Sequence, residues 1–320
     1  MNTPRIIRRV VPPTRRVRHD TTNARAARTV RHIRLMRVAG LVGKKRRGRL
    51  PKQLIPTTIE REYANALARY AEIVRKAFGP FLAELPALME SANRDRTAAL
   101  KTDAGEGRRI RELIEQAQTN IRSSITTGDL EKLAVAFAER TATWQRKEMS
   151  KQVTAALGAD VFLADRQLKP LTEAFVNANV GLIKNIGDKT AFDVEAATMR
   201  AIQAGTLHGD LTKELEARFD FNESRAALIA RDQIGKAYGQ INAARHRELG
   251  VDRFIWRTVG DERVRDDHSD RDGVEYSYND PPEGELPGEP INCRCYADPV
   301  FDTFEDAATE AADETSSTRA

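Results

Sequence analysis

The stretch that decides the fold is NESRAALIARDQIGKAYGQINAARHRELG, residues 222–250. Its small and β-branched side chains recur at steps of three and four residues, which is the period of one face of an α-helix. Small residues on such a face let a second helix approach closely. Asn222 is the expected N-cap and Gly250 the expected C-terminal stop. The expected buried face consists of Ala227, Ala230, Ile234, Ala237, Ile241 and Ala244.

The same helical rhythm extends back to Thr57, where the stretch TTIEREYANALARYAEIVRKAF begins. Trp144 lies in one of these helical stretches and is expected to pack against its neighbours. Three shorter helices are expected before the long one: the first ends near Gly187, the second is closed by Gly205, and the third is capped and starts near Asp210. Residues 57–250 are therefore expected to be almost wholly helical.

The composition changes at Val251. Aromatic and β-branched residues appear there together with several prolines and glycines, a mixture typical of short strands and turns. Residues 301–320 hold six acidic residues and one arginine, and are expected to be a frayed acidic tail. The sequence therefore predicts a mainly α protein, with an elongated helical body (57–250) followed by a small C-terminal α+β or irregular β module (251–300).

A basic arm, residues 1–56, precedes the helical body. Its first 52 residues hold 17 lysines and arginines and one acid, a net charge of +16, whereas the rest of the chain carries −11. Nucleic acid phosphates, an acidic protein surface and a solvated tail are three alternatives for this arm. A transit peptide is disfavoured because the first serine is Ser91. The candidate DNA contacts are Arg15, Arg16, Arg18, Lys44, Lys45, Arg46, Arg47 and Arg49.

Cysteine content and hydropathy limit the class of protein further. Two cysteines cannot form a disulfide framework, which favours a reducing compartment. No apolar run approaches the roughly 18 residues that cross a bilayer, and no signal-peptide pattern is present. No membrane partner is therefore expected.

The polar stretch WRTVGDERVRDDHSDRDG, residues 256–273, raises the question of a calcium loop. His268, Asp270, Asp272 and Gly273 follow the spacing of such a loop. The loop's first ligand should be Asp and its last a bidentate Glu, but His268 and Asn279 occupy those positions. The stretch therefore fails as a calcium loop at its two most important ligands.

Zinc is the second alternative for this region. Cys293 and Cys295 can turn toward one metal ion, and His268 can supply a third ligand. A structural zinc site needs four ligands, and Asp266, Asp267 or Asp270 could complete it. The competing interpretation is two buried thiols in a small core. No cofactor is expected, with zinc at His268, Cys293 and Cys295 as the alternative.

Hydrolysis is the third alternative. His268 lies near Asp266 and Asp270 in sequence and could act as a general base in a zinc-assisted nuclease. The sequence has no nucleophilic residue at a motif spacing that would pair it with this base, and no Gly-rich phosphate loop precedes a helix. Acid-rich turns are usually structural, so no catalytic residue is expected.

Four pieces of the sequence follow one another: AALIAR (226–231), ELGVDRFIWRTVGDERVRDDHSDRDG (248–273), a Pro-Pro pair (281–282) and PINCRC (290–295). Taken in this order, they resemble the Mu F-like family of head-morphogenesis, or minor head, proteins of tailed bacteriophages. The resemblance covers roughly residues 170–300. The residues that carry it are Trp256, Asp261, Arg263, His268, Asp272, Gly273, Cys293, Arg294 and Cys295.

The resemblance implies a structural virion protein rather than an enzyme. The partners expected for such a protein are the portal protein, the major capsid protein or both, and packaged DNA, which the basic arm would reach. The expected location is the virion head, and the host cytoplasm during assembly. A zinc- or His-dependent nuclease and a plain nucleic-acid-binding protein are the alternatives.

The resemblance also suggests how the module is built. Asp261, Arg263 and His268 would form a buried polar network, and Asp272-Gly273 would form a turn. The small core would consist of Trp256, Cys293 and Cys295. Some relatives carry a Cys-x-x-Cys pair where this chain has Arg265 and His268, and a histidine at the position of Pro290-Ile291. Half of that zinc-ligand set is missing here.

Overall fold

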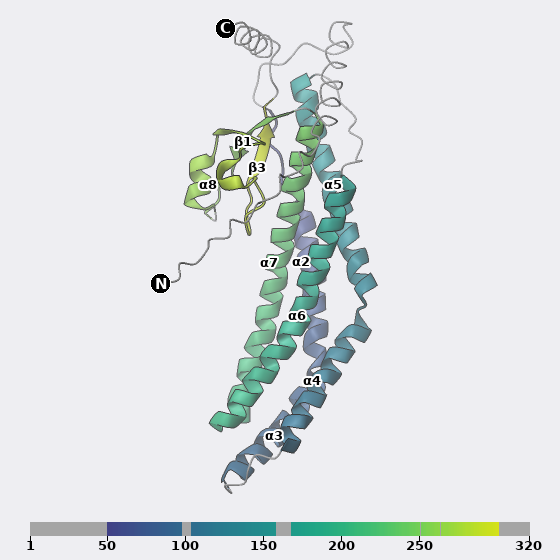
Figure 1. Ribbon diagram of the computed structural model, residues 1–320, viewed down its shortest axis with the longest axis vertical. Helices are drawn as coiled ribbons and strands as arrows, with labels where there is room; N and C mark the ends of the chain where they lie inside the picture. The colour runs from purple at the N-terminus through teal and green to yellow at the C-terminus, as the bar shows by residue number, and fades with distance from the viewer. Residues whose placement is uncertain (1–49, 98–103, 158–167, 250, 263, 301–320) are drawn as a thin grey trace, which may run out of the picture.

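The computed structural model describes residues 50–97, 104–157, 168–249, 251–262 and 264–300, and its fold is mainly α. Long helices run side by side along the long axis of the molecule, and a small module lies beside the upper end of α7 (Figure 1). The helices of the body are α2 (Thr57–Ala77), α3 (Gly79–Thr97), α4 (Ala104–Ser124), α5 (Thr127–Leu157), α6 (Leu168–Ala204) and α7 (His208–Glu248).

The module contains a three-stranded antiparallel sheet of order β2-β1-β3. Burial alternates along β1, which places Phe254 and Trp256 on its inner face. In the register of the sheet, Phe254 pairs with Tyr276 of β2 and Trp256 pairs with Ala297 of β3. The elements of the module are β1 (Arg253–Arg257), α8 (Asp266–Arg271), β2 (Glu275–Ser277), η2 (Pro282–Gly284) and β3 (Tyr296–Pro299).

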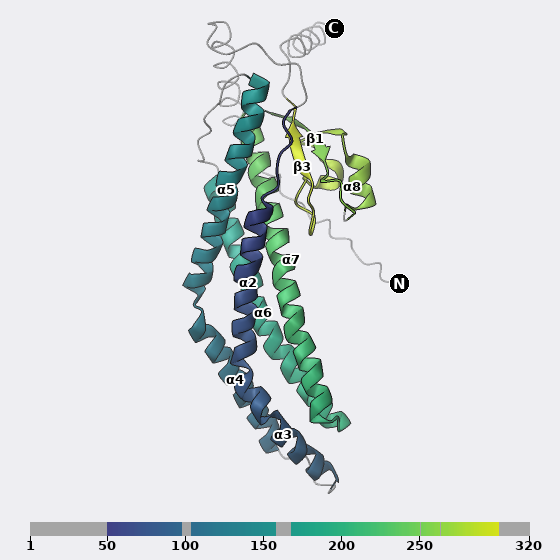
Figure 2. The same ribbon diagram turned by 180° about the vertical axis from the view of Figure 1, so that it is seen from behind.

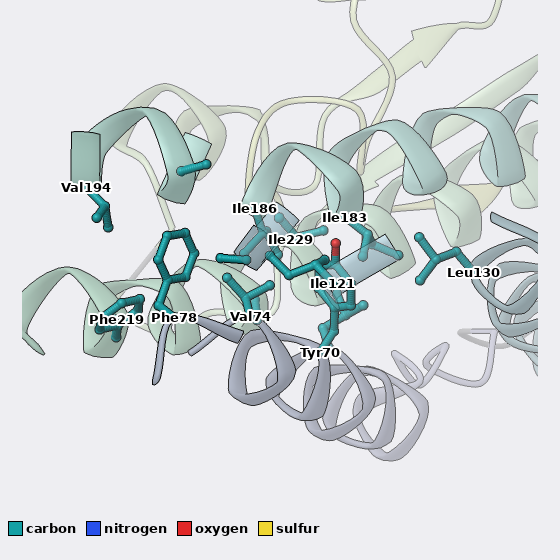
Figure 3. Packing of buried hydrophobic residues seen from close by; sticks show 14 of the residues in the cluster. Tyr70, Val74, Phe78, Ile121, Leu130, Ile183, Ile186, Val194, Phe219 and Ile229 are labelled. Carbon is teal, nitrogen blue, oxygen red and sulfur yellow. The ribbon is translucent and has the colours of Figure 1, made fainter. Parts of the chain in front are cut away.

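Helix α2 packs lengthwise against α7 on one face of the body (Figure 2). Its apolar stripe, which the sequence predicted, is buried at Tyr63, Leu67, Tyr70 and Val74. These side chains pack against α7 and α6, and Figure 3 shows Tyr70 and Val74 among isoleucines from the neighbouring helices. A fully buried apolar side chain of this size contributes about 1.5–3 kcal/mol. The buried stripe of α2 therefore stabilises its packing against α6 and α7.

The helix boundary expected near Gly187 is wrong, because α6 continues unbroken from Leu168 to Ala204. A Cβ atom at Gly187 would lie 3.2 Å from the Tyr70 hydroxyl oxygen and 3.6 Å from Ile121. The glycine thus allows close packing between helices and does not end one. Gly205, by contrast, does follow the last residue of α6, with a φ of +69° that favours glycine.

The long helix α7 also differs from its expected form. It begins at His208, so Asn222 lies inside the helix and is not its N-cap. The Asn222 side chain is buried and donates a hydrogen bond to Thr190 Oγ1 of α6 at 2.9 Å. Ala227 is exposed, whereas Ala230, Ile234 and the rest of the expected face through Ile241 are buried. Burial thus follows a stripe that includes Ala226 in place of Ala227.

The module packs against the body through a second hydrophobic cluster. Met149 and Val153 of α5 and Ala243 of α7 contribute to this cluster from the helical side. Phe254 and Trp256 contribute from the sheet. The module therefore shares a core with the upper halves of α5 and α7 (Figure 1).

A buried polar network joins the segment before α2 to this region. Gln53 is 1% exposed, and its Nε2 donates to Gln152 Oε1 at 2.6 Å. The Tyr238 hydroxyl donates to Gln53 Oε1 at 2.8 Å, and Gln152 Nε2 donates to Asp298 Oδ1 at 2.9 Å. Asn242 Nδ2 donates to the carbonyl of Ala297 in β3. The chain that leads into α2 is therefore fixed beside β3 and α5 (Figure 2).

His246, in the last turn of α7, makes stability depend on pH. Burial lowers its pKa to about 3, and its Nδ1 is hydrogen-bonded to the Tyr278 hydroxyl. Below pH ~6.5 the unfolded chain binds a proton at this residue that the folded chain does not. The contribution of neutral His246 is therefore fully present above pH ~6.5 and is lost as the pH falls toward 3.

Between pH 6.5 and 5, we expect the unfolding free energy to fall by about 2 kcal/mol more in the wild type than in His246→Asn, whose amide does not titrate. Urea unfolding at a series of pH values measures this difference. His208 is exposed, so His208→Asn should keep the wild-type pH dependence. If the unfolding free energy of the wild type and of His246→Asn depended on pH in the same way, His246 would not be the source of the pH dependence.

None of the helices in the described ranges is long and apolar enough to cross a membrane. The candidate DNA contacts of the basic arm, from Arg15 to Arg49, lie outside the residues that the structure describes, as does the acidic tail 301–320.

Candidate functional site

The loop that precedes β3 rests directly on the backbone of α7. Two glycines of α7, Gly235 and Gly239, face this loop. A Cβ atom at Gly239 would lie 2.4 Å from the Pro287 carbonyl oxygen, and one at Gly235 would lie 3.2 Å from the Cys293 carbonyl oxygen. Gly288 of the loop has a φ of +95° and also contacts Gly239. The two glycines therefore set how closely the module approaches α7.

We expect Gly239→Ala to lower the unfolding free energy by about 1–3 kcal/mol, because backbone must move to admit the methyl group. This loss outweighs the gain of up to ~1 kcal/mol that alanine brings to a helix interior. Gly181 of α6 is the matched control, since nothing lies within 4 Å of a Cβ atom built there. Gly181→Ala should stabilise the protein, and chemical denaturation of both variants checks the opposite signs.

Ion pairs connect α2, α7 and the module beside this loop. Glu60 of α2 accepts hydrogen bonds from Arg231 of α7 at 3.2 Å and from Arg294 of the module at 3.2 Å. The Glu60 carboxylate is only 14% exposed. Arg294 also lies 3.6 Å from Asp261 Oδ2. Glu60 thus joins three parts of the chain that are far apart in sequence.

Two further polar contacts hold the loop 290–295 in place. Asp232 of α7 accepts a hydrogen bond from the backbone N–H of Asn292 at 2.9 Å. Asn292 has a φ of +57°, a left-handed conformation that asparagine tolerates. Arg265 donates to the carbonyl of Ile291 at 2.8 Å. Cys293 and Cys295 therefore follow a backbone that is fixed from both α7 and the segment before α8.

His268 and the two cysteines form one buried cluster. His268 Nδ1 lies 3.5 Å from Cys293 Sγ and 3.5 Å from Cys295 Sγ. The backbone N–H of Cys295 donates to Cys293 Sγ at 3.4 Å. Hydrogen bonding from the Cys295 thiol lowers the pKa of Cys293 to about 6, and the same shared proton raises the pKa of Cys295. Cys293 is therefore the sulfur that more readily becomes a thiolate.

Trp256 covers this cluster on the side of the sheet. Its ring meets the His268 ring edge-on, with centroids 5.3 Å apart. The Arg271 guanidinium lies 5.2 Å from the indole centroid and pairs with Glu283 at 2.9 Å. The prediction that Trp256, Cys293 and Cys295 form the small core is confirmed, because all three belong to the module's hydrophobic cluster.

The predicted polar network holds only in part. Asp261 is exposed and Arg263 lies outside the described residues, so a buried network through Asp261 is wrong. Its carboxylate lies 3.6 Å from Arg294 Nη1. The predicted turn at Asp272-Gly273 is confirmed, because Gly273 has a φ of +83° and Asp272 accepts a hydrogen bond from the Thr258 N–H at 2.7 Å.

The candidate calcium and hydrolytic residues are placed differently from the zinc candidates. Asp266, Asp270 and Asp272 are exposed. The carboxylate beside the His268 ring is that of Asp267, whose Oδ2 lies 3.7 Å from Nε2. Within the described ranges, His268, Cys293 and Cys295 are the group of His, Cys, Asp and Glu side chains close enough together to hold one metal ion.

Glu60, Asp232 and the glycine pair are site residues that the sequence analysis missed. The spacing of Gly235 and Gly239 in GKAYG was a usable signal, since small residues four apart on a helix permit close packing. Glu60 gave no such signal, because it lies 234 residues from Arg294.

Comparison with known proteins supports the family resemblance over part of the chain. Residues 192–297 match the family described as Phage Mu protein F like protein. They include the end of α6, all of α7 and the module up to β3. An uncharacterised protein of Haemophilus influenzae is 34% identical over 183 residues, which are 56% of this chain and 41% of that protein.

The chain thus spans less than half the length of this relative. No solved structure shows significant similarity. The matched residues include α7 and the loop 290–295, which the glycine pair and the ion pairs hold together. Residues 192–297 are therefore a Mu F-like region, and the resemblance to this phage family is confirmed for that part of the chain.

Proposed function

We propose that this chain is a minor head protein of a tailed bacteriophage, located inside the head and bound to the portal protein. The observation that supports this most strongly is the Mu F-like match over residues 192–297. Those residues form a single packed unit of helix and module rather than a detached motif. Such a unit suits a structural part of a larger assembly.

The helical body is the proposed contact with the portal or major capsid protein. Large apolar side chains are exposed on α6 and α7 in the half of the body remote from the module. Phe192 and Phe221 are 68% and 61% exposed, and Leu207 at the turn between the two helices is 69% exposed. These exposed side chains mark the part of the body that we propose as the contact surface.

Quantitative mass spectrometry of purified particles, with lysine cross-linking, tests the proposal. We expect a few copies per particle, measured against the major capsid protein as internal standard, and cross-links to portal. Exposed Lys184 of α6 and Lys213 of α7 report on the body. A chain that stays in the lysate and is missing from particles would overturn the proposal.

The basic arm is the proposed contact with packaged DNA. Its support is the net charge of +16 over residues 1–52. Binding that neutralises phosphates should weaken steeply with salt, with a slope of log affinity against log salt of about −0.9 per phosphate contacted. A deletion of residues 1–49 keeps Gln53 and its buried partners, so the body should fold.

Binding of double-stranded DNA by the full chain and by this deletion decides whether the arm is responsible. We expect the deletion to lose salt-sensitive binding and still to enter particles. A second deletion, of residues 301–320, is the control for shortening the chain. It removes acidic residues and leaves the basic arm in place, so DNA binding should remain. Unchanged DNA binding without residues 1–49 would exclude the arm.

A further inference from the structure

We propose that His268 Nδ1, Cys293 Sγ and Cys295 Sγ bind one zinc ion, which fastens α8 to the loop before β3. The inference does not depend on the proposed role in the phage head. All three side chains are buried, and their ligand atoms lie within 4.8 Å of one another. Two of them come from the loop that rests on α7, and the third comes from α8.

The distances match a tetrahedral metal centre. Zinc binds histidine nitrogen at about 2.0–2.1 Å and cysteine sulfur at about 2.3 Å, which separates the two atoms by about 3.6 Å at a tetrahedral angle. The observed separation is 3.5 Å from Nδ1 to each sulfur. Both nitrogen–sulfur separations are therefore those expected when one zinc ion binds the three atoms.

Hydrogen bonding alone accounts less well for this arrangement. One ring nitrogen carries at most one proton, or accepts with one lone pair, so Nδ1 cannot form full hydrogen bonds with both sulfurs. A metal ion satisfies the nitrogen and both sulfurs together. Two thiolates and a neutral imidazole also balance the charge of Zn²⁺, which suits a site whose three residues are buried.

The groups around the cluster are of the kind found beside metal-bound histidine and cysteine. A carboxylate near the second ring nitrogen is the usual partner of a metal-bound histidine, and Asp267 Oδ2 lies 3.7 Å from His268 Nε2. The Trp256 ring packs against the imidazole. The backbone N–H of Cys295 donates to Cys293 Sγ, which supports that sulfur as a thiolate.

The fourth coordination position is assigned to water. The described residues supply three ligands, and zinc with three protein ligands commonly binds water in the fourth position. A cavity of about 140 Å³ adjoins His268, Cys293 and Cys295 and is also lined by Asp261 and Arg265. This cavity is large enough for a water molecule and offers polar groups to bind it.

Metal analysis of the full chain, purified with a non-chelating reductant and added zinc, tests the proposal. We expect about one zinc per chain after removal of unbound metal, and loss of that zinc in Cys293→Ser, Cys295→Ser and His268→Gln. His208→Gln is the matched control and should retain the metal, because His208 is exposed on α7, away from the cluster. A folded wild-type chain that retains no zinc would overturn the proposal.

Two further measurements test the proposal without any substitution of the three ligands, so they remain informative even if a ligand variant fails to fold. Co²⁺ added to the wild-type chain should produce the near-ultraviolet charge-transfer band of a cobalt–thiolate bond, and a chelator should remove it. Asp267→Asn should weaken zinc binding about tenfold by loosening the histidine, whereas Asp270→Asn, also on α8 and exposed, should not. A cobalt spectrum without this band would show that the sulfurs do not bind metal.

Discussion

Trp256→Ala is expected to lower the free energy of unfolding by about 3–5 kcal/mol. Trp256 is fully buried, and its ring contacts the rings of His268 and Tyr276 and the Arg271 guanidinium. Alanine would leave a cavity at the centre of the module and remove the stacking partner of Arg271. Urea unfolding followed by circular dichroism measures the loss, because the substitution removes a fluorophore.

Trp144 provides the matched control, since the chain has two tryptophans. Its side chain is half-buried at the edge of the core, and its indole N–H donates to the Leu54 carbonyl at 2.8 Å. Trp144→Ala should cost about 1–2 kcal/mol, because less apolar area and one hydrogen bond are lost. If Trp256→Ala and Trp144→Ala lowered the unfolding free energy equally, the module's core would contribute less to stability than its burial suggests.

Asn242→Leu is expected to cost about 3 kcal/mol. The Asn242 Oδ1 atom accepts hydrogen bonds from Gln145 at 2.7 Å and from Gln53 at 3.3 Å, and its Nδ2 donates to the Ala297 carbonyl at 2.9 Å. Leucine has a similar size but can satisfy none of these groups. Each buried polar group left without a partner costs about 1–3 kcal/mol.

Asn185→Leu on α6 separates this effect from the general effect of placing leucine in a helix. Asn185 is exposed and accepts one hydrogen bond, from Arg225. Its loss should change stability by about 0.5 kcal/mol or less. Chemical denaturation of both variants gives the comparison, and a change below about 1 kcal/mol for Asn242→Leu would contradict the importance of the buried network.

The helices could be predicted because burial repeats with the period of an α-helix. The stripe of α2 is an example, with Tyr63, Leu67 and Tyr70 on one face. The boundaries were less predictable, since glycine and asparagine have more than one role. Gly187 makes room for Tyr70, and Asn222 binds Thr190 across two helices. Both roles depend on neighbours that local sequence does not reveal.

The site shows the same division between local and distant information. Trp256, Cys293 and Cys295 were predictable as a core, because large or apolar residues in a small module tend to be buried. The sequence also named His268 as a third zinc ligand. The sequence could not indicate that His268 Nδ1 would lie equally far from both sulfurs. His268 precedes Cys293 by 25 residues and Cys295 by 27 residues, so only the fold brings them together.

The packing of α2 against α7 has a consequence for synthesis on the ribosome. Glu60 meets Arg231, its partner on α7, only after 171 further residues have been added. At about 5–20 residues per second, that delay is roughly 10–30 s. During most of this time the apolar stripe of α2 has neither a complete α6 nor α7 to cover it. The nascent chain is therefore expected to need protection from aggregation, by a chaperone or by temporary pairing of α2 with α4, until α7 emerges.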